Sequence, residues 1–394
     1  MSLPPLRLRK NEDRRLRAGH LWVFSNEVDV QATPLTRFAP GDAVEIQDAR
    51  GGPLGTGYVN PRSLIAARLV TRTRGRALDG DLLRERMARA LSLRERIFTG
   101  PFYRLVFGES DGLPGLVVDR FGDYLVAQLT TAGMERLKAE VVDALAATLS
   151  PRGILLRNDV PGRALEGLES YVETALGEVP DALPVEENGA RFEAPIGGQK
   201  TGWFYDHRMN RARMQSWVPG RRVLDVFSYV GGWGVQAATA GASDVLCVDA
   251  SAPALDALRH NAGLNGVGEK VRVMKADAFD ALRALAAEGE TFDVVVLDPP
   301  AFIKRKKDQK AGEEAYRRIA QLGMEVLRPE GVLISASCSF HMTREALQDA
   351  MLRAARHLRR DLQIVDEGHQ GPDHPVHPAI PETAYLKAFF GRVG

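Results

Sequence analysis

The chain has 394 residues, of which 44% are hydrophobic and 26% are charged, and its formal net charge is +1. This describes an ordinary soluble protein of two or three domains and excludes a strong overall electrostatic bias. No apolar run is long enough to cross a membrane and residues 1–10 lack a signal-peptide core, so we expect a cytoplasmic protein. Its two cysteines give neither a disulfide framework nor a Cys-x-x-Cys metal pattern, and no metal is expected.

The N-terminal part of the chain carries a local positive charge. Residues 1–76 contain thirteen Lys and Arg against seven Asp and Glu. Turns rich in Gly and Pro separate short apolar segments, which predict strands within 19–24, 43–47, 55–59 and 64–71. We interpret this part as a small β barrel with an arginine-bearing rim. Its candidates for RNA contact are Arg7, Arg9 and Arg62, and a solvated basic face is the alternative.

The segment after the barrel predicts a compact α+β module. A helix is expected from Asp81 to about Phe98, and the segment Asp79-Gly80-Asp81 is the expected linker and N-cap. Its apolar spacing predicts a buried stripe of Leu82, Leu83, Met87, Ala90, Leu91, Leu93 and Ile97. Strands at 124–129 and 153–157 should flank a second helix at 134–148. This module shows no catalytic combination of residues, so we interpret it as a scaffold.

The stretch from Arg221 to Asp249 predicts a strand, a glycine turn, a helix and a second strand. Its turn does not have the G-x-G-x-x-G spacing of a dinucleotide site, and Asp225 would repel a pyrophosphate. A carboxylate instead suits the amino-bearing half of S-adenosylmethionine, and an acid at the tip of the second strand can bind ribose hydroxyls. The sequence thus favours a Rossmann-like α/β methyltransferase domain, and a glycine-rich turn of some other α/β enzyme is the alternative. Its cofactor candidates here are Asp225, Ser228, Tyr229, Gly231, Gly232 and Asp249.

A cluster of aromatic and polar residues precedes this domain. Lys200, Thr201 and Phe204 are candidates for the wall of a cofactor pocket. Core packing is the alternative for the aromatic residues of this cluster.

Two further strand tips carry polar groups. Asp277 and Ala278 follow a strand at 271–275, and Asp277 can accept a hydrogen bond from an adenine amino group. Asp298 ends an apolar strand that Pro299 and Pro300 terminate, which places a carboxylate at the ligand-binding edge of the sheet. Asp298 is therefore a candidate for both cofactor and substrate base.

An aromatic residue follows the two prolines, as in enzymes that methylate exocyclic amines. Here Ala301 stands between Pro300 and Phe302, which weakens that interpretation.

Cys338 follows another buried strand and is flanked by two serines. C5 of a pyrimidine becomes nucleophilic once a thiolate adds to C6, and amine methylation needs no such group. Cys338 is the predicted nucleophile, and Asp298, protonated or hydrogen-bonded to the ring, would stabilise its developing charge. A buried structural cysteine is the alternative, which we accept for Cys247.

The runs DVFSYVGGWG, DPPAF, SCS, GHLWVF and RLVFGESDGLPGLVVDRFG resemble the bacterial 23S ribosomal RNA large-subunit methyltransferase I family over essentially the whole chain. The resemblance implies a PUA domain at 1–76, a central α+β domain at 77–180 and an S-adenosylmethionine-dependent domain at 186–394 that makes 5-methylcytosine. It places the nucleophile on Cys338 and cofactor acids on Asp249 and Asp277. Related guanine N7 enzymes have Asn in place of this cysteine. Many RNA 5-methylcytosine enzymes carry a second cysteine where this chain has Ala301.

Lys304, Arg305 and Lys306 form a basic loop next to the candidate base site and are further candidates for RNA contact, with Pro299, Pro300 and Phe302 beside them. A solvated loop is the alternative for these basic residues. The expected partner is 23S rRNA, protein-free or in an early assembly intermediate, because the target base must leave its stack. No membrane partner is expected, and a homodimer stays open. An amine or guanine N7 methyltransferase and a noncatalytic RNA-binding module are the alternative functions.

Overall fold

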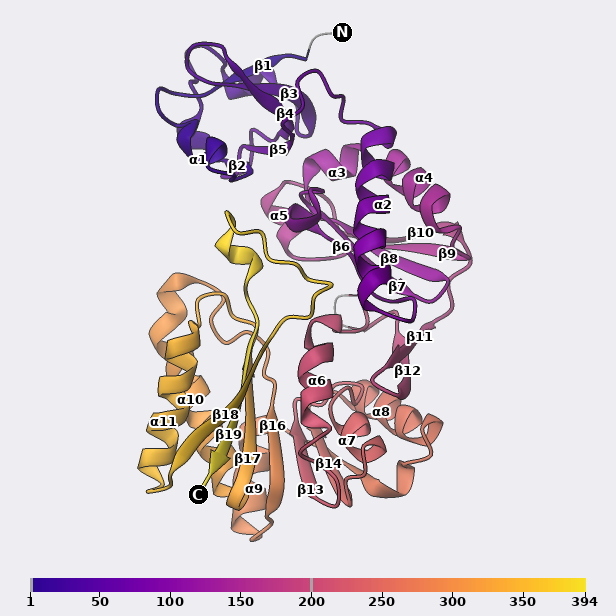
Figure 1. The fold of residues 1–394 in the computed structure, drawn as a ribbon, viewed down its shortest axis with the longest axis vertical. Helices are drawn as coiled ribbons and strands as arrows, with labels where there is room; N and C mark the ends of the chain where they lie inside the picture. Colours follow the sequence, from indigo (N-terminus) through magenta and orange to yellow (C-terminus); the bar gives the residue numbers. More distant parts are fainter. Residues whose placement is uncertain (1–2, 199–200) are drawn as a thin grey trace. The chain divides into compact units, whose positions relative to one another are not determined.

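The computed structural model describes residues 3–198 and 201–394 of the chain, which divides into two compact units (Figure 1). Of the described residues, the first unit contains 3–183, 201–203 and 372–383, and the second contains 184–198, 204–371 and 384–394. No helix within the described residues is both long and apolar enough to cross a membrane.

A five-stranded sheet forms the N-terminal part of the first unit, in the order β1-β3-β4-β5-β2. Its strands are β1 (Pro5–Arg7), β2 (Trp22–Val23), β3 (Asp42–Gln47), β4 (Pro53–Val59) and β5 (Ala67–Thr71), and helix α1 (Arg14–Arg17) follows β1. The predicted barrel strands are confirmed. Their inward side chains, among them Leu6, Val44 and Leu69, make a separate small core.

The rest of the first unit is a second five-stranded sheet, in the order β10-β9-β8-β7-β6. Its strands are β6 (Phe102–Phe107), β7 (Leu116–Phe121), β8 (Tyr124–Leu129), β9 (Gly153–Asn158) and β10 (Tyr171–Gly177). Its helices are α2 (Gly80–Ile97), α3 (Ala132–Arg136), α4 (Lys138–Leu149) and α5 (Gly162–Leu165). The helix predicted at 134–148 is divided, because Leu137 has non-helical backbone angles (φ −95°, ψ 18°) between α3 and α4.

Helix α2 corrects part of the predicted buried stripe. Within the predicted linker and N-cap segment, Asp79 is the capping residue, and its carboxylate accepts from the Leu82 amide. Leu93 and Ile97, however, are 39% and 42% exposed. The interior position at this end of the helix belongs to Arg94, which is fully buried and bonds both carboxylate oxygens of Asp111. A buried ion pair cannot be recognised from apolar spacing, which explains the error.

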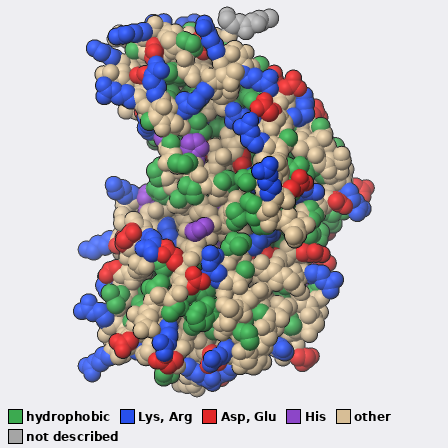
Figure 2. All heavy atoms as spheres, in the orientation of Figure 1, with side chains coloured by type: hydrophobic (Ala, Val, Ile, Leu, Met, Phe, Trp, Pro, Cys, Tyr) green, Lys and Arg blue, Asp and Glu red, His purple; other side chains and the backbone are tan. Residues whose placement is uncertain are grey.

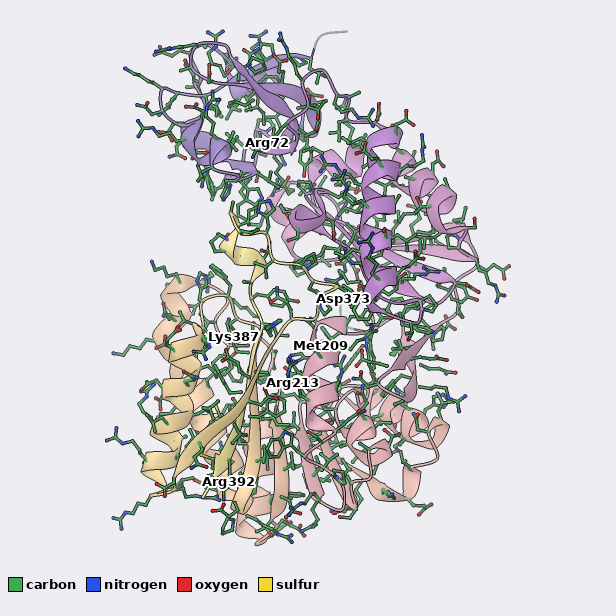
Figure 3. The ribbon with its side chains drawn as sticks, in the orientation of Figure 1. Arg72, Met209, Arg213, Asp373, Lys387 and Arg392 are labelled. Carbon is green, nitrogen blue, oxygen red and sulfur yellow. The ribbon has the colours of Figure 1, made fainter. Side chains whose placement is uncertain are left out.

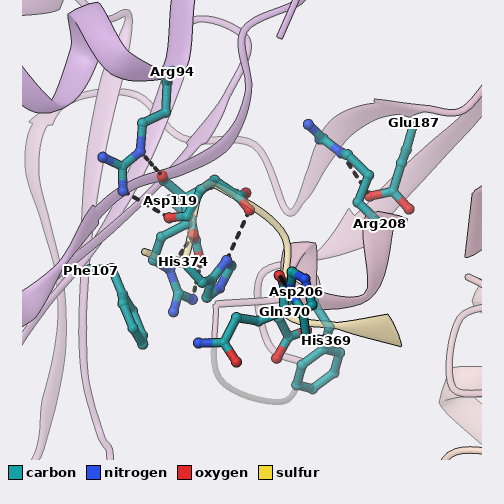
Figure 4. Close-up of polar contacts among 12 residues, drawn as sticks. Arg94, Phe107, Asp119, Glu187, Asp206, Arg208, His369, Gln370 and His374 are labelled. Carbon is teal, nitrogen blue, oxygen red and sulfur yellow. Dashed lines mark hydrogen bonds and ion pairs between the residues drawn. The ribbon is translucent and has the colours of Figure 1, made fainter. Parts of the chain in front are cut away.

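Two paired strands, β11 (Ala182–Glu187) and β12 (Ala190–Pro195), lie where the second unit starts and precede helix α6 (Arg208–Met214). Glu187 is buried and forms ion pairs with Arg208 and Arg211 of α6, the first of which is visible in Figure 4. Burial favours the protonated form of Glu187, but the two guanidinium groups outweigh it and lower its pKa. The hairpin and α6 are therefore joined by charge-assisted hydrogen bonds.

A seven-stranded sheet is the centre of the second unit, in the order β15-β14-β13-β16-β17-β19-β18. Its strands are β13 (Arg222–Val226), β14 (Asp244–Asp249), β15 (Val271–Lys275), β16 (Phe292–Leu297), β17 (Leu327–Ser337), β18 (Leu362–His369) and β19 (Lys387–Val393). The first five are parallel, whereas β19 is antiparallel to both β17 and β18. The predicted Rossmann-like architecture is confirmed.

Helices cover both faces of this sheet. Its remaining helices are α7 (Gly234–Thr239), α8 (Ala252–Leu264), α9 (Ala278–Ala287), α10 (Gln309–Glu325) and α11 (Arg344–His357). Successive strand residues point to opposite faces, so Leu224 packs with α9, α10 and α11 while Val223 packs with α6, α7 and α8. The strand order reverses beside β13, and open α/β sheets bind ligands at the carboxyl ends of the strands at such a point.

Candidate active site

The glycine turn after β13 is tightly fixed. Gly231 has φ +92° and Tyr229 φ +48°, conformations that place the turn across the end of the sheet. A side chain at Gly234 would lie 2.3 Å from the sulfur of Cys247, so only glycine fits between α7 and β14. Gly231 and Gly232 thus supply backbone to the site rather than side-chain chemistry.

Asp225 and Ser228 present buried polar atoms without a partner in the described structure. Asp225 Oδ2 accepts from the Gly234 amide at 2.8 Å, but its Oδ1 has no hydrogen-bond partner, and neither has the Ser228 hydroxyl. Leaving such groups unsatisfied costs roughly 1–3 kcal/mol each, which a bound polar ligand can offset. Burial, together with the charges of Asp298 and Asp249, raises the pKa of Asp225 to about 7. These atoms suit the ammonium group of an amino acid moiety.

Asp249 ends β14 and Asp277 follows β15, and both carboxylates accept hydrogen bonds from backbone amides. Asp249 accepts from the backbone amides of Tyr229 and Ser251, at 2.9 and 2.8 Å. Asp277 is exposed and caps α9 by accepting from the Phe279 and Asp280 amides, while Ala278 begins that helix and is buried. Carboxylate oxygens accept more than one hydrogen bond, so both acids retain acceptor capacity for hydroxyl or amino groups.

The segment preceding α6 splits between the two units. Phe204 contacts the ring of Tyr229 edge-on, with 5.7 Å between centroids, within the second unit. Thr201 belongs to the first unit, where its hydroxyl donates to Asp119 at 2.6 Å. Its hydroxyl is therefore engaged in the central sheet rather than in the glycine turn. Lys200 lies outside the described residues.

Asp298 is held by two neighbours at the tip of β16. Trp233 Nε1 donates to its Oδ2 at 3.0 Å, and His207 Nε2 lies 3.1 Å from its Oδ1. Burial favours the protonated carboxyl, but the interactions with His207 and Trp233 outweigh it and lower the pKa of Asp298. The ionised carboxylate is thus the relevant form, which argues against the protonated role considered from the sequence. Neither His207 nor Trp233 could be assigned this task from sequence spacing.

The loop after Asp298 contributes an aromatic cluster. Phe302 lies 4.9 Å from the ring of Tyr316 and also contacts Phe227 and Phe279, with longer centroid distances of 6.4 and 6.3 Å. Pro299 is buried and Pro300 is exposed. The basic residues that follow, Lys304, Arg305 and Lys306, are exposed, and Arg305 pairs with Asp308 of its own turn.

Cys338 is partly exposed, whereas Cys247 is buried and its thiol pKa is raised well above its ordinary value by that burial. The serines beside Cys338 are fixed by Tyr316: Ser337 donates to its hydroxyl at 2.8 Å, and Ser339 lies 3.1 Å from the same oxygen. The Ile303 amide donates to Ser339, so the loop after Asp298 and the triplet around Cys338 are tied together. Candidate groups of neighbouring strands β16 and β17 therefore share one edge of the sheet.

Lys387 at the start of β19 is a site residue that the sequence did not reveal (Figure 3). It pairs with Ser337 in the sheet, and its ammonium donates to the carbonyls of Ser339 and Tyr385 at 2.7 and 2.8 Å. Burial lowers the pKa of Lys387 to about 8, and the charge of the Cys338 thiolate acts in the opposite direction. Cys338 thus has a cation close by.

The rim arginines of the barrel have different surroundings. Arg9 is exposed and donates to the Val28 carbonyl, and Arg62 is exposed beside Gly167. Arg7 is only partly exposed, with a buried Nε that has no partner in the described residues. Lys and Arg side chains are frequent on this part of the molecule (Figure 2).

The sheet order, the glycine turn and the acids at the strand tips are those of an S-adenosylmethionine-dependent methyltransferase. A family model of that description matches residues 144–392, and a PUA-like domain model matches residues 6–72. The chain is 38% identical to Ribosomal RNA large subunit methyltransferase I of Klebsiella pneumoniae, over 99% of this chain and 98% of that one. The protein of the same name from Shewanella denitrificans is also 38% identical, over 98% and 99%. The chain belongs to the ribosomal RNA large subunit methyltransferase I family.

Solved structures support the same fold. A putative S-adenosylmethionine-dependent methyltransferase from Streptococcus mutans aligns with a TM-score of 0.82 at 20% identity, over 99% of this chain and all of that one. A second putative methyltransferase, solved in complex with SAH, aligns with a TM-score of 0.84 at 19% identity over the same shares. The unpartnered oxygens of Asp225 and Ser228 fit the amino acid end of S-adenosylmethionine, so the residues present suit the family's cofactor.

Proposed function

We propose that this enzyme methylates C5 of a specific cytosine in 23S rRNA, with S-adenosylmethionine as methyl donor and Cys338 as covalent nucleophile. The observation that carries the proposal is the setting of Cys338: it is partly exposed, lies between two anchored serines, and has the ammonium of Lys387 nearby. A cation stabilises a thiolate, which is the nucleophilic form of cysteine.

The thiolate of Cys338 forms a bond to C6 of the base, and the electron pair of the C5–C6 double bond moves onto C5. When bound, S-adenosylmethionine supplies the electrophilic methyl group that C5 accepts. Loss of the C5 proton and cleavage of the C6–S bond then restore the aromatic ring and release Cys338. Lys387 stabilises the thiolate before the first step and again when it leaves.

Ionised Asp298 gives a basis for choosing cytosine. A carboxylate accepts from the exocyclic amino group of cytosine, whereas uracil presents a carbonyl oxygen at the same position and would be repelled. Trp233 and His207 hold the carboxylate in one orientation, so its remaining acceptor sites are preorganised.

Different residues would bind different parts of the cofactor. Asp225 and Ser228 would hold the amino acid end, Asp249 the ribose hydroxyls and Asp277 the adenine amino group, with Phe227, Phe279 and Phe302 as the aromatic surroundings. The barrel, residues 1–76, and the central module, residues 77–180, would serve RNA binding and support, and residues 186–394 would carry the chemistry.

The test is methyl transfer from labelled S-adenosylmethionine to protein-free ribosomal RNA, followed by nucleoside mass analysis. Wild-type protein should form 5-methylcytosine, and Cys338→Ala should form none. With RNA containing 5-fluorocytidine, the wild type should form a complex that survives denaturing electrophoresis, because fluorine cannot leave C5 as a proton does.

The two alternative functions give different results in the same assay. A methylated amine or guanine N7, or activity retained by Cys338→Ala, would refute the cysteine mechanism. RNA binding without any methyl transfer would point to a noncatalytic module.

A further inference from the structure

The first unit contains a cavity of about 1070 Å³ between strand β5, helix α2 and the turn that follows β6. We call it the arginine groove, after the five arginines that line it: Arg72, Arg76, Arg86, Arg89 and Arg96. Three carboxylates also line it, namely Glu85, Glu109 and Asp111. None of these residues belongs to the site described above.

Two of the carboxylates interact with arginines that do not line the groove, although one of these, Arg68, also pairs with Glu166 at 3.0 Å. Asp111 is bonded through both oxygens to Arg94, at 2.6 and 2.8 Å. Glu109 accepts from the Trp22 indole at 2.8 Å and lies 3.8 Å from Arg68. Glu85 pairs with two of the lining guanidinium groups, those of Arg76 at 3.5 Å and Arg89 at 3.3 Å. Five cations thus line the groove against three acids, so its surface is positive.

Two of the lining arginines bond neutral carbonyl oxygens. Arg72 donates to the His20 carbonyl at 3.1 Å, and Arg86 donates to the Gly112 carbonyl at 2.6 Å. Burial lowers the pKa of both groups, and for Arg86 the neighbouring charge of Arg89 lowers it further. These cations would be stabilised by an anion, and a guanidinium can bind phosphate oxygens through several N–H groups at once.

The groove also offers a hydroxyl and an apolar floor. Ser110 lines it, and its buried hydroxyl has no hydrogen-bond partner among the described residues. Leu21, Leu69 and Leu82 also line the groove and can contact ribose or bases. A small-molecule pocket has mostly apolar walls with a few polar groups, whereas this one is dominated by cations.

The arginines of α2 form a row. Arg86, Arg89 and Arg96 are spaced three and seven residues apart, which places them on one side of the helix. At about 1.5 Å per residue, the row from Arg86 to Arg96 extends roughly 15 Å, a length that a strand of several nucleotides can follow. The basic side chains around β5 and α2 are seen in the upper part of Figure 2.

We propose that the arginine groove binds a single-stranded segment of the substrate RNA through its phosphates, apart from the residues that carry out methylation. This proposal rests on the proposed function only in taking RNA as the substrate. It assigns the groove to affinity and leaves the chemical step to the second unit.

The test compares Arg89→Ala and Arg96→Ala with Arg84→Ala. Arg84 is a matched control, because it is exposed on the same helix, pairs with an acid of that helix as Arg89 does, and does not line the groove. Binding of protein-free ribosomal RNA is measured by fluorescence anisotropy over a range of salt concentrations. Each groove variant should weaken binding several-fold and reduce the slope of log Kd against log salt by about 0.7, the value for one phosphate contact on a single strand. Arg89→Lys should keep that slope.

Methyl transfer supplies the second measurement. The groove variants should raise KM for RNA and leave kcat at saturating RNA, cofactor affinity and melting temperature unchanged. Wild-type affinity and salt slope in Arg89→Ala and Arg96→Ala would overturn the groove proposal. The binding experiment is also carried out with Cys338→Ala protein, because RNA affinity does not depend on the cysteine chemistry. Failure of the cysteine mechanism is therefore distinguished from failure of the groove proposal. Absence of RNA binding by the wild type would count against both proposals.

Discussion

Replacing Asp225 by Asn should stabilise the cofactor-free protein at neutral pH while weakening the binding of S-adenosylmethionine. The carboxyl is fully buried, its Oδ1 has no partner among the described residues, and burial raises its pKa from 3.8 to about 7. Asn keeps an oxygen that can accept from the Gly234 amide but cannot ionise.

The size and direction of the change in stability caused by Asp225→Asn follow from proton linkage. Because its pKa is raised on folding, the folded protein holds this proton more tightly than the unfolded chain does. The contribution of protonated Asp225 to the free energy of unfolding is therefore complete below pH 3.8 and is lost as pH rises through about 7. One unit of pKa corresponds to about 1.4 kcal/mol, so between pH 5 and pH 8 the free energy of unfolding of Asp225→Asn should gain about 2–3 kcal/mol relative to wild type.

Cofactor affinity of the wild type should rise with pH, whereas its stability falls with pH. The ammonium group of S-adenosylmethionine favours ionised Asp225, so wild-type affinity should rise roughly tenfold between pH 6 and pH 7.5. The variant should bind more weakly than wild type at pH 7.5 and lose most of this dependence.

Urea unfolding of both proteins at several pH values, with calorimetric titration of the cofactor, measures both effects. A stability difference that does not change with pH would refute the assigned titration of Asp225. Wild-type cofactor affinity in the variant would refute its assignment to the ammonium group.

Further predictions concern the sheet edge. Lys387→Met should lower methyl transfer about tenfold or more at pH 7 and recover in part at pH 9, because removal of the cation raises the pKa of the Cys338 thiol; a uniform loss across pH would contradict this role. Trp233→Phe should lower kcat/KM roughly tenfold, because Asp298 loses the hydrogen bond from the indole. If Asp298→Asn methylated cytosine as fast as wild type does, the role of this carboxylate in base recognition would be disproved. Iodoacetamide should label the native chain at Cys338 and leave buried Cys247 unmodified, as mass analysis of peptides would show.

Much of the sheet could be predicted from the sequence because buried parallel strands are continuous apolar runs. The bounds predicted for β8 and β15 agree with the structure, and the linker and N-cap predicted at 79–81 contains the capping residue, Asp79. Strand β18 was not predicted, since most of its residues are exposed and its sequence, LQIVDEGH, lacks a clear apolar pattern.

Site residues that act through tertiary contacts were harder to predict. Asp225, Asp249 and Asp298 could be chosen as candidates from the sequence because each lies within or directly follows an apolar strand of the sheet. Lys387 was missed because its proximity to Cys338 depends on β19 entering the sheet between β17 and β18. His207 and Trp233 reach Asp298 from separate segments, which no spacing rule relates to β16.

The path of the chain between the two units has a consequence for cleavage. Residues 201–203 and 372–383 belong to the first unit although they lie within the sequence of the second, so the backbone passes between the units five times. A protease that cuts once, for example in the turn between β11 and β12, would leave each fragment with portions of both units. Such a nick should therefore not release a free barrel on gel filtration, and a gene fragment that stops before residue 372 would encode β18 without β19, its neighbour in the sheet.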